Sequence, residues 1–250
     1  MKRHVLFIVF ALAAAAGFAQ TVSVAAAANL SAVEIPLATA FAEAHPGMRL
    51  QFSFGSSGTL VTQILNGAPF QAFLSADRGF AQKVADAGLA SGPVKTYAVG
   101  KLIALSTTPI DTAKGVLAVL DPRVVQFAVA NPETAPYGRA AVEALTKAGI
   151  YEQVKAKQLT AQSIAQAVPF TITAGFGFLN RSAVLSKELA PYDKEGTYWF
   201  EVDPSLYSPI EQGYVVLKAD AAKPEVKAFD DFLLSAAAQK VFAAYGYGKP

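Results

Sequence analysis

Residues 48–65 have the sequence MRLQFSFGSSGTLVTQIL. Leu50, Phe52 and Phe54 alternate with other residues, which predicts a strand over residues 48–54. A loop of small residues, 55–58, follows, and a helix is expected through Leu65. Strand, loop and helix in this order form the repeating unit of α/β folds with mainly parallel sheets.

The same unit recurs along the chain on both sides of this segment. A buried strand is expected at 21–27, and residues 31–34 have the pattern of a capping box that opens the next helix. The other strands are expected at 70–74, 97–106, 124–130, 175–179, 199–202 and 214–217, and the other helices at 80–87, 140–148, 163–167 and 224–245. The length of 250 residues fits two α/β lobes of ordinary domain size.

Composition excludes several classes of function. Hydrophobic residues make up 53% of the chain and charged residues 16%, so a packed core is expected. Cysteine is absent, which excludes disulfides, thiolate chemistry and a lipid anchor on cysteine. The chain has two histidines, His4 and His45, which leaves little scope for a histidine-based triad or metal site.

The N-terminus has the pattern of an export signal. Lys2 and Arg3 precede an apolar run over residues 5–16, and small residues at Gly17 and Ala19 suit a cleavage site after Ala19. The run is shorter than the roughly 20 residues that a membrane span needs. We therefore expect residues 1–19 to be a signal peptide and the protein to be exported to a periplasm. The remaining chain has 19 basic and 19 acidic residues and no basic run, so no nucleic-acid partner is expected.

Three loops share a design that suits an anion. The loops at residues 27–31, 55–59 and 135–138 each lie between an expected strand and the start of a helix, and residues 162–164 lie at another helix start. Helix N-termini present unpaired N–H groups and a partial positive charge. None of these loops has Lys, Arg or His at its centre, so an anion would be held by neutral donors.

Each loop also has a purely structural interpretation. Asn29 alone is most simply a helix cap, the Gly-Ser loop at 55–58 a turn, and Ile164 a core residue. The carboxylates Asp77 and Glu211 have no partner that would make an acid–base pair. Ser57 lacks a nucleophile elbow, so the chain is not expected to be an enzyme.

Five segments together resemble one family, the periplasmic molybdate-binding proteins of ABC importers. They occur in order and span almost the whole expected mature chain: AAANL at 26–30, FGSSGTL at 54–60, GAPF at 67–70 with FLSAD at 73–77, ANPETAPYG at 130–138 and PIEQ at 209–212.

The resemblance implies a two-lobed periplasmic binding protein fold (type II) that closes over one tetrahedral oxyanion. It implies that Asn29 and Ser57 bind the anion from the first lobe, and Tyr137 and Ile164 from the second. Asn29 and Ser57 would give side-chain and backbone donors, and Tyr137 and Ile164 backbone N–H groups, with the Tyr137 hydroxyl as a further candidate. No cofactor or metal-cation ligand is implied. The ligand would be molybdate, and tungstate with it, since the two anions are similar in size and charge.

Two places that could contact the ligand depart from the family pattern. Ala28 stands where relatives can have a hydroxyl residue, and the region of Phe178 and Leu179 where some have a ligand-contacting tyrosine. Gln71 also replaces an acidic residue that is often seen there.

The resemblance further implies lobes that are discontinuous in sequence. We expect residues 20–93 and 217–250 to form lobe 1 and residues 94–216 to form lobe 2, with crossings near 93–97 and 214–218. A permease in the inner membrane is the expected partner, and a monomer the expected state. Two alternatives remain: a receptor for sulfate or another tetrahedral oxyanion, and a secreted serine hydrolase that uses Ser57.

Overall fold

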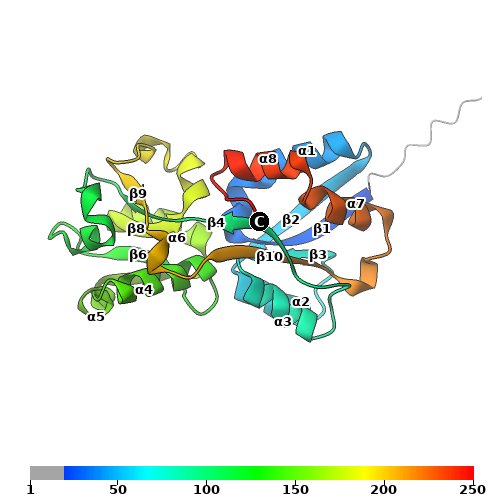
Figure 1. The fold of residues 1–250 in the computed structure, drawn as a ribbon, viewed down its shortest axis with the longest axis horizontal. Coiled ribbons are helices and arrows are strands. Elements are labelled where there is room, and N and C mark those ends of the chain that lie inside the picture. Colours follow the sequence, from blue (N-terminus) through cyan, green and yellow to red (C-terminus); the bar gives the residue numbers. More distant parts are fainter. Residues whose placement is uncertain (1–19) are drawn as a thin grey trace, which may run out of the picture.

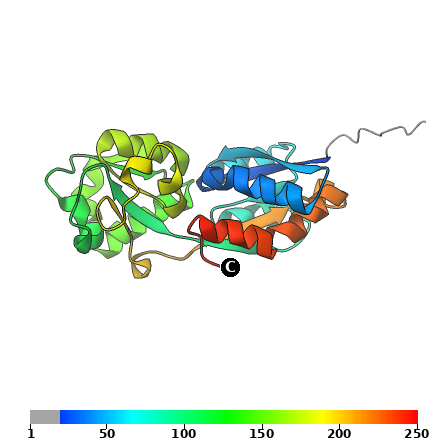
Figure 2. The ribbon, with the colours of Figure 1, turned by 90° about the horizontal axis from the view of Figure 1, so that it is seen from above.

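The computed structural model describes residues 20–250, which form two lobes side by side (Figures 1 and 2). The expected signal peptide, residues 1–19, lies outside the described residues. Within residues 20–250, no helix is long and apolar enough to cross a membrane.

Lobe 1 is built on a five-stranded sheet in the order β2-β1-β3-β10-β4. β1, β2 and β3 are parallel, and β10 is antiparallel to both β3 and β4. The strands are β1 (Gln20–Ala27), β2 (Met48–Gly55), β3 (Ala72–Leu74), β4 (Lys95–Gly100) and β10 (Ile210–Val216).

Helices cover both faces of this sheet. One face carries α1 (Glu34–Ala44), α7 (Pro224–Leu233) and α8 (Ala236–Ala244), and the other carries α2 (Ser57–Leu65) and α3 (Arg78–Asp86) (Figure 1). Successive residues of β1 therefore contact different cores: Val24 packs with the first group and Ala25 with the second. Burial of both faces explains why the strand is an almost continuous apolar run.

Lobe 2 has a second five-stranded sheet in the order β7-β6-β8-β5-β9. Its strands are β5 (Leu102–Ser106), β6 (Phe127–Ala130), β7 (Gln158–Ala161), β8 (Phe176–Asn180) and β9 (Trp199–Glu201), and its helices are α4 (Pro136–Lys147), α5 (Tyr151–Val154) and α6 (Ile164–Ala174). Short 3-10 helices complete the chain: η1 (Ala28–Val33), η2 (Thr112–Leu120), η3 (Lys155–Lys157), η4 (Arg181–Leu185), η5 (Ala190–Tyr192), η6 (Pro204–Leu206) and η7 (Lys218–Asp220).

The crossings between the lobes lie elsewhere than expected. The run at 97–106, expected as one strand, is two strands in different sheets, separated by Lys101 alone. The second crossing falls in residues 202–209, because β10 already pairs with β4 from Ile210 onward. The expected boundaries at 93/94 and 216/217 are therefore wrong. A strand that continues from one sheet into another has no turn residues to reveal the change. The C-terminal helices do return to lobe 1, as expected.

Three smaller expectations also differ from the structure. Ser31 does not cap a helix, since β1 enters the 3-10 turn η1 directly and α1 begins at Glu34 without a side-chain cap. The expected helix 224–245 is broken at Ser235, whose hydroxyl caps α8 by accepting from the N–H of Ala238. Strand β7 was not expected, because its sequence has only one strongly apolar residue, Leu159.

The topology gathers the small-residue loops at one place. In lobe 1, η1 and α2 begin directly after the carboxyl ends of β1 and β2, and in lobe 2, α4 and α6 follow the carboxyl ends of β6 and β7. Open α/β sheets bind ligands at this edge of the strands. The two edges face each other between the lobes.

Candidate functional site

A small cavity lies where the two lobes meet. Both lobes line it, through residues from β1 and η1, the start of α2, the start of α4 and the start of α6: Ala27, Ala28, Asn29, Gly55, Ser56, Ser57, Ala76, Ala135, Pro136, Tyr137 and Ile164. All four sequence-predicted site residues, Asn29, Ser57, Tyr137 and Ile164, are therefore brought together there.

Three α-helices present their N-termini to this cavity. The first residues of α2 and α6 are Ser57 and Ile164, and Tyr137 is the second residue of α4. The N–H groups in the first turn of a helix have no acceptor inside that helix. Ser56 and Ser163 cap their helices at the third position only, and α4 has no side-chain cap. The N–H groups of Ser57, Tyr137 and Ile164 therefore remain available to an anion.

The hydroxyl of Ser57 is poised as a donor. Its Oγ accepts a hydrogen bond of 3.0 Å from the N–H of Ala76, and Ser57 is almost fully buried. A hydroxyl that accepts through a lone pair still has its own hydrogen to donate. The sequence supports this arrangement locally, because the N-cap role falls to Ser56 and leaves Ser57 free of it.

Asn29 is held by a buried hydrogen-bond network. Its Nδ2 donates to Gln212 Oε1 at 3.0 Å and to the Tyr247 hydroxyl at 2.9 Å, which uses both amide hydrogens. Its Oδ1 is buried with no partner among residues 20–250. The side-chain donor that the family resemblance implied for Asn29 is thus engaged inside the protein. Its backbone N–H, in the first turn of η1, is the donor that Asn29 has left.

The Tyr137 hydroxyl is engaged inside the protein and is not assigned to anion binding. It accepts from Gln212 Nε2 at 3.4 Å, in the buried region beside β4. Burial, with further contributions from Tyr247, Tyr97 and Tyr207, raises the pKa of Tyr137 well above its usual value. The phenol is therefore neutral at physiological pH. Tyr137 can serve an anion through its N–H, while its ring anchors the start of α4.

The lobes contact each other around the cavity. The N–H of Gly58 in lobe 1 donates to the carbonyl of Thr134 in lobe 2 at 3.0 Å. The Arg139 guanidinium of lobe 2 pairs with the Asp77 carboxylate of lobe 1. Asp77 also caps α3 through the N–H of Phe80. These contacts describe a closed arrangement of the lobes.

The lining of the cavity carries no formal charge. Tyr137 is its one titratable residue, and it is neutral. Residues 20–250 contain no group of three or more His, Cys, Asp or Glu side chains arranged to hold a metal ion. What the cavity offers is a set of N–H and O–H donors in a low-dielectric environment, where hydrogen bonds to a charged group are stronger than in water.

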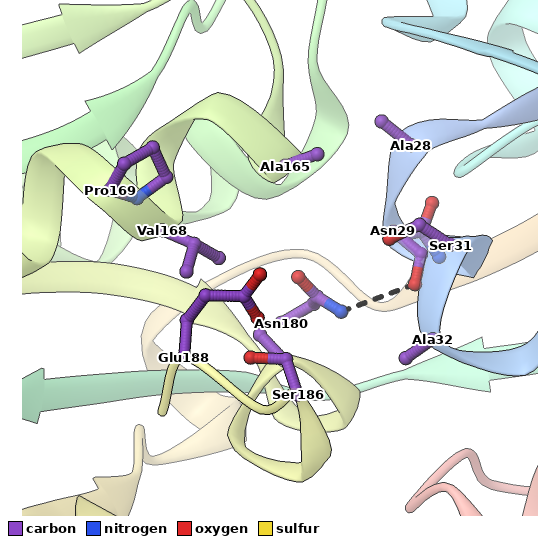
Figure 3. Close-up of a pocket in the computed structure, with 11 residues that line it drawn as sticks. Ala28, Asn29, Ser31, Ala32, Ala165, Val168, Pro169, Asn180, Ser186 and Glu188 are labelled. Carbon is purple, nitrogen blue, oxygen red and sulfur yellow. Dashed lines mark hydrogen bonds between the residues drawn. The ribbon is translucent and has the colours of Figure 1, made fainter. Parts of the chain in front are cut away.

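A larger groove adjoins the cavity and shares Ala28 and Asn29 with it (Figure 3). Its volume is about 380 Å³, and it runs between η1 and the α6 residues Ala165, Val168 and Pro169. Asn180 lies at its base and donates from Nδ2 to the carbonyl of Asn29 at 3.3 Å (Figure 3).

The two departures from the family pattern are now placed. Ala28 lines the cavity and brings no hydroxyl there. Phe178 and Leu179 belong to the core of lobe 2, where Phe178 packs against Phe127 and Phe176.

Sequence reasoning missed two residues that support the site, Gln212 and Tyr247. The sequence contains only a weak signal for Gln212: Ile210 and Gln212 lie two residues apart and so on one face of a strand, and the structure shows both buried with Glu211 exposed between them. Tyr247 follows the last helix and had no such signal, because only the return of the C-terminus to lobe 1 brings it to Asn29.

The fold and the site together define a class: a two-lobed binding protein with a small, uncharged cavity between its lobes. The chain belongs to the family of bacterial extracellular solute-binding proteins, whose model matches residues 22–248.

Individual relatives agree with this assignment. The chain is 41% identical to the molybdate-binding protein ModA of Rhodobacter capsulatus over 95% of this chain and 90% of the relative. It is 38% identical to ModA of Azotobacter vinelandii over 99% of this chain and 98% of the relative. The solved structure of the Azotobacter vinelandii periplasmic molybdate-binding protein matches with a TM-score of 0.83 and 30% identity, over 92% of this chain and 99% of that one.

These comparisons confirm the two-lobed type II fold and the family resemblance. The relatives are named as binding proteins, which confirms that this chain is not an enzyme.

Proposed function

We propose that this protein captures molybdate, and tungstate with it, in the periplasm and delivers it to the permease of an ABC importer. The observation that carries the proposal is the convergence of three helix N-termini and the Ser57 hydroxyl on one uncharged cavity. The ligand named for the relatives at 41% and 38% identity supports the choice of anion.

Neutral donors suit a fully ionised oxyanion. The four N–H groups of Asn29, Ser57, Tyr137 and Ile164 and the hydroxyl of Ser57 make five candidate donors. Each hydrogen bond to a charged group contributes about 1.5–3 kcal/mol net. Five such bonds give roughly 8–15 kcal/mol before the cost of association, which is compatible with tight binding. No cofactor or metal cation takes part in this proposal.

Closure of the lobes over the anion is the second part of the proposed function. The cavity measures about 10 Å³ in this arrangement, close to the smallest volume that holds a water molecule. A tetrahedral oxyanion has five heavy atoms and is larger than water, so its binding requires the cavity to widen while donors from both lobes stay in contact with it. A ligand that contacts both lobes stabilises the closed state over an open one, and a permease can recognise that difference.

The test is a calorimetric titration of residues 20–250 with molybdate, tungstate, sulfate and phosphate at neutral pH. We expect one-to-one binding of molybdate and tungstate, with sulfate at least about a hundredfold weaker, a difference of about 2.8 kcal/mol. If sulfate bound as tightly as molybdate, the protein would instead be a general receptor for tetrahedral oxyanions. Binding of none of the four anions would contradict the proposal.

A further inference from the structure

We propose that Gln212 is a positioning residue for anion binding, which acts by fixing the side chain of Asn29. The proposal rests on the function proposed above. Gln212 does not itself line the cavity; it lies behind the lining residues, on β10, and is fully buried.

Two carbonyl groups fix the orientation of the Gln212 amide. Its Nε2 lies 3.2 Å from the carbonyl oxygen of Ala76 and 3.4 Å from that of Ile210. A carbonyl oxygen can only accept, so the nitrogen must be on this side. Oε1 is therefore turned toward Asn29, and the hydroxyl of Tyr97 lies within 3.3 Å of it as well.

The orientation of Gln212 in turn fixes that of Asn29. Because Oε1 is an acceptor, the Asn29 amide must turn its Nδ2 toward it, and the second hydrogen of Nδ2 goes to Tyr247. The Asn29 carbonyl is held at the same time, since it accepts from Tyr247 at 2.8 Å and from Ser182 at 3.2 Å. Side chain and backbone of Asn29 are thus both immobilised next to its free N–H.

Gln212 lies where it can contact residues of both lobes. β10 is the strand by which the chain returns from lobe 2 to lobe 1, and its register shifts between Gln212 and Gly213. Nε2 also reaches the hydroxyl of Tyr137, the lobe 2 residue at the start of α4. The hydrogen bonds of Gln212 thus join Asn29 of lobe 1 to Tyr137 of lobe 2, and a buried network of this kind rigidifies the arrangement in which its members meet.

Gln212→Met tests the proposal, and Gln71→Met is its matched control. Gln71 is also a buried glutamine of lobe 1, and its Oε1 accepts from the N–H of Ser23 at 2.9 Å. Gln71 directly precedes β3, so it lies at the amino-terminal end of that strand, whereas the cleft lies at the carboxyl ends. Both variants remove one buried amide, so a general loss of stability is common to them.

Molybdate affinity is measured by calorimetry at a temperature where circular dichroism shows each variant folded. Gln212→Met should weaken binding at least about tenfold, whereas Gln71→Met should stay within about twofold of the unmodified protein. In the Asn29→Ala background, Gln212→Met should add less than about threefold, because its effect passes through Asn29. Equal affinities of the two methionine variants, or additive effects of Asn29→Ala and Gln212→Met, would overturn the proposal.

A readout without any anion separates this proposal from the proposed function. The side-chain amide resonances of Asn29 in a nitrogen–proton correlation spectrum should shift in Gln212→Met and remain in place in Gln71→Met. If the unmodified protein binds no oxyanion, the proposed function fails, and unshifted Asn29 resonances would overturn the positioning role as well. Should Gln212→Met not fold, Gln212→Asn withdraws the amide from Asn29 by one methylene, and the same shift and the same weakening are expected.

Discussion

A Cβ atom on residue 100 would lie 2.2 Å from the hydroxyl oxygen of Tyr137. Gly100 is the last residue of β4, and Tyr137 is the second residue of α4 in the other lobe. The absence of a side chain at Gly100 thus makes room for the phenol that anchors one of the candidate donor helices. Gln212 Nε2 occupies the same space, 2.7 Å from that position.

Gly100→Ala is therefore expected to displace Tyr137. Overpacking of this kind costs about 1–3 kcal/mol of stability. We also expect the affinity for molybdate to fall, because the N–H of Tyr137 moves with its ring. Gly92→Ala is the matched control, since a Cβ there meets nothing within 4 Å. Calorimetric titration and thermal unfolding of both variants check this; equal behaviour of the two would contradict it.

Ser57→Ala should weaken molybdate binding about tenfold or more, which corresponds to about 1.4 kcal/mol. The variant loses the hydroxyl donor and leaves the N–H of Ala76 without its acceptor. Molybdate affinity is expected to fall by the same factor in Asn29→Ala, because the Asn29 side chain takes part in a larger hydrogen-bond network. Ser91→Ala, in the loop before β4, should leave the affinity unchanged. Titration of the three variants is the measurement, and an unchanged affinity of Ser57→Ala would remove that residue from the site.

Arg139→Gln removes the ion pair with Asp77 that joins the lobes. The Arg139 side chain is nearly half exposed, so the pair contributes at most about 1 kcal/mol. We expect faster dissociation of molybdate and an affinity up to about fivefold lower, with a smaller effect at high ionic strength. Arg123→Gln breaks the pair with Asp121 inside lobe 2 and serves as control. The measurement is the stopped-flow rate of molybdate dissociation at low and high salt. A dissociation rate that is slower in Arg139→Gln than in the unmodified protein would contradict a role of the ion pair in closure.

Molybdate affinity is expected to be constant between about pH 6 and 9. The one titratable residue that lines the cavity is Tyr137, and burial keeps its pKa well above the usual value. Neither protein nor ligand therefore changes charge at the site in this range. Titrations at several pH values check this, and a steep change of affinity would indicate an ionisable group at the site.

Stability should fall at alkaline pH, because buried tyrosines, Tyr97, Tyr137 and Tyr247 among them, have raised pKa values. Burial raises the pKa of Tyr247 to about 12 and those of Tyr97 and Tyr137 well above 10. An unfolded tyrosine loses its proton near pH 10, so above that value the unfolded state binds fewer protons than the folded one. The contribution to stability is complete below pH 10 and is lost as pH rises through the folded-state values. Denaturant unfolding at pH 8 and above pH 10 measures it; equal stability at both would contradict the assignment.

Local sequence patterns located the loops of the candidate site because each loop is a local feature. Each candidate donor lies at a junction of strand, small-residue loop and helix start, but the choice of Asn29, Ser57, Tyr137 and Ile164 within these loops came from the family resemblance. The parallel order of the strands then requires these junctions to lie at the same edge of each sheet. The family resemblance added the anion, the four residues that would bind it and the closure of the two lobes over it.

The sequence did not locate the crossings or the supporting network, and the reason is physical. The apolar run from Tyr97 to Ser106 has the same alternation in either sheet, so only the pairing of β4 with β10 and of β5 with β8 shows that it divides at Lys101. The contacts of Gln212 and Tyr247 with Asn29 join residues about 180 and 220 positions apart.

The sequence by itself thus determined the α/β class, through periodicity that acts over short distances, and the family, through motifs that each span a few residues; the four candidate donor residues followed from the family resemblance. The tertiary structure decided which donor of Asn29 remains free, because that depends on long-range hydrogen bonds whose partners meet only when both sheets and the C-terminal segment are packed.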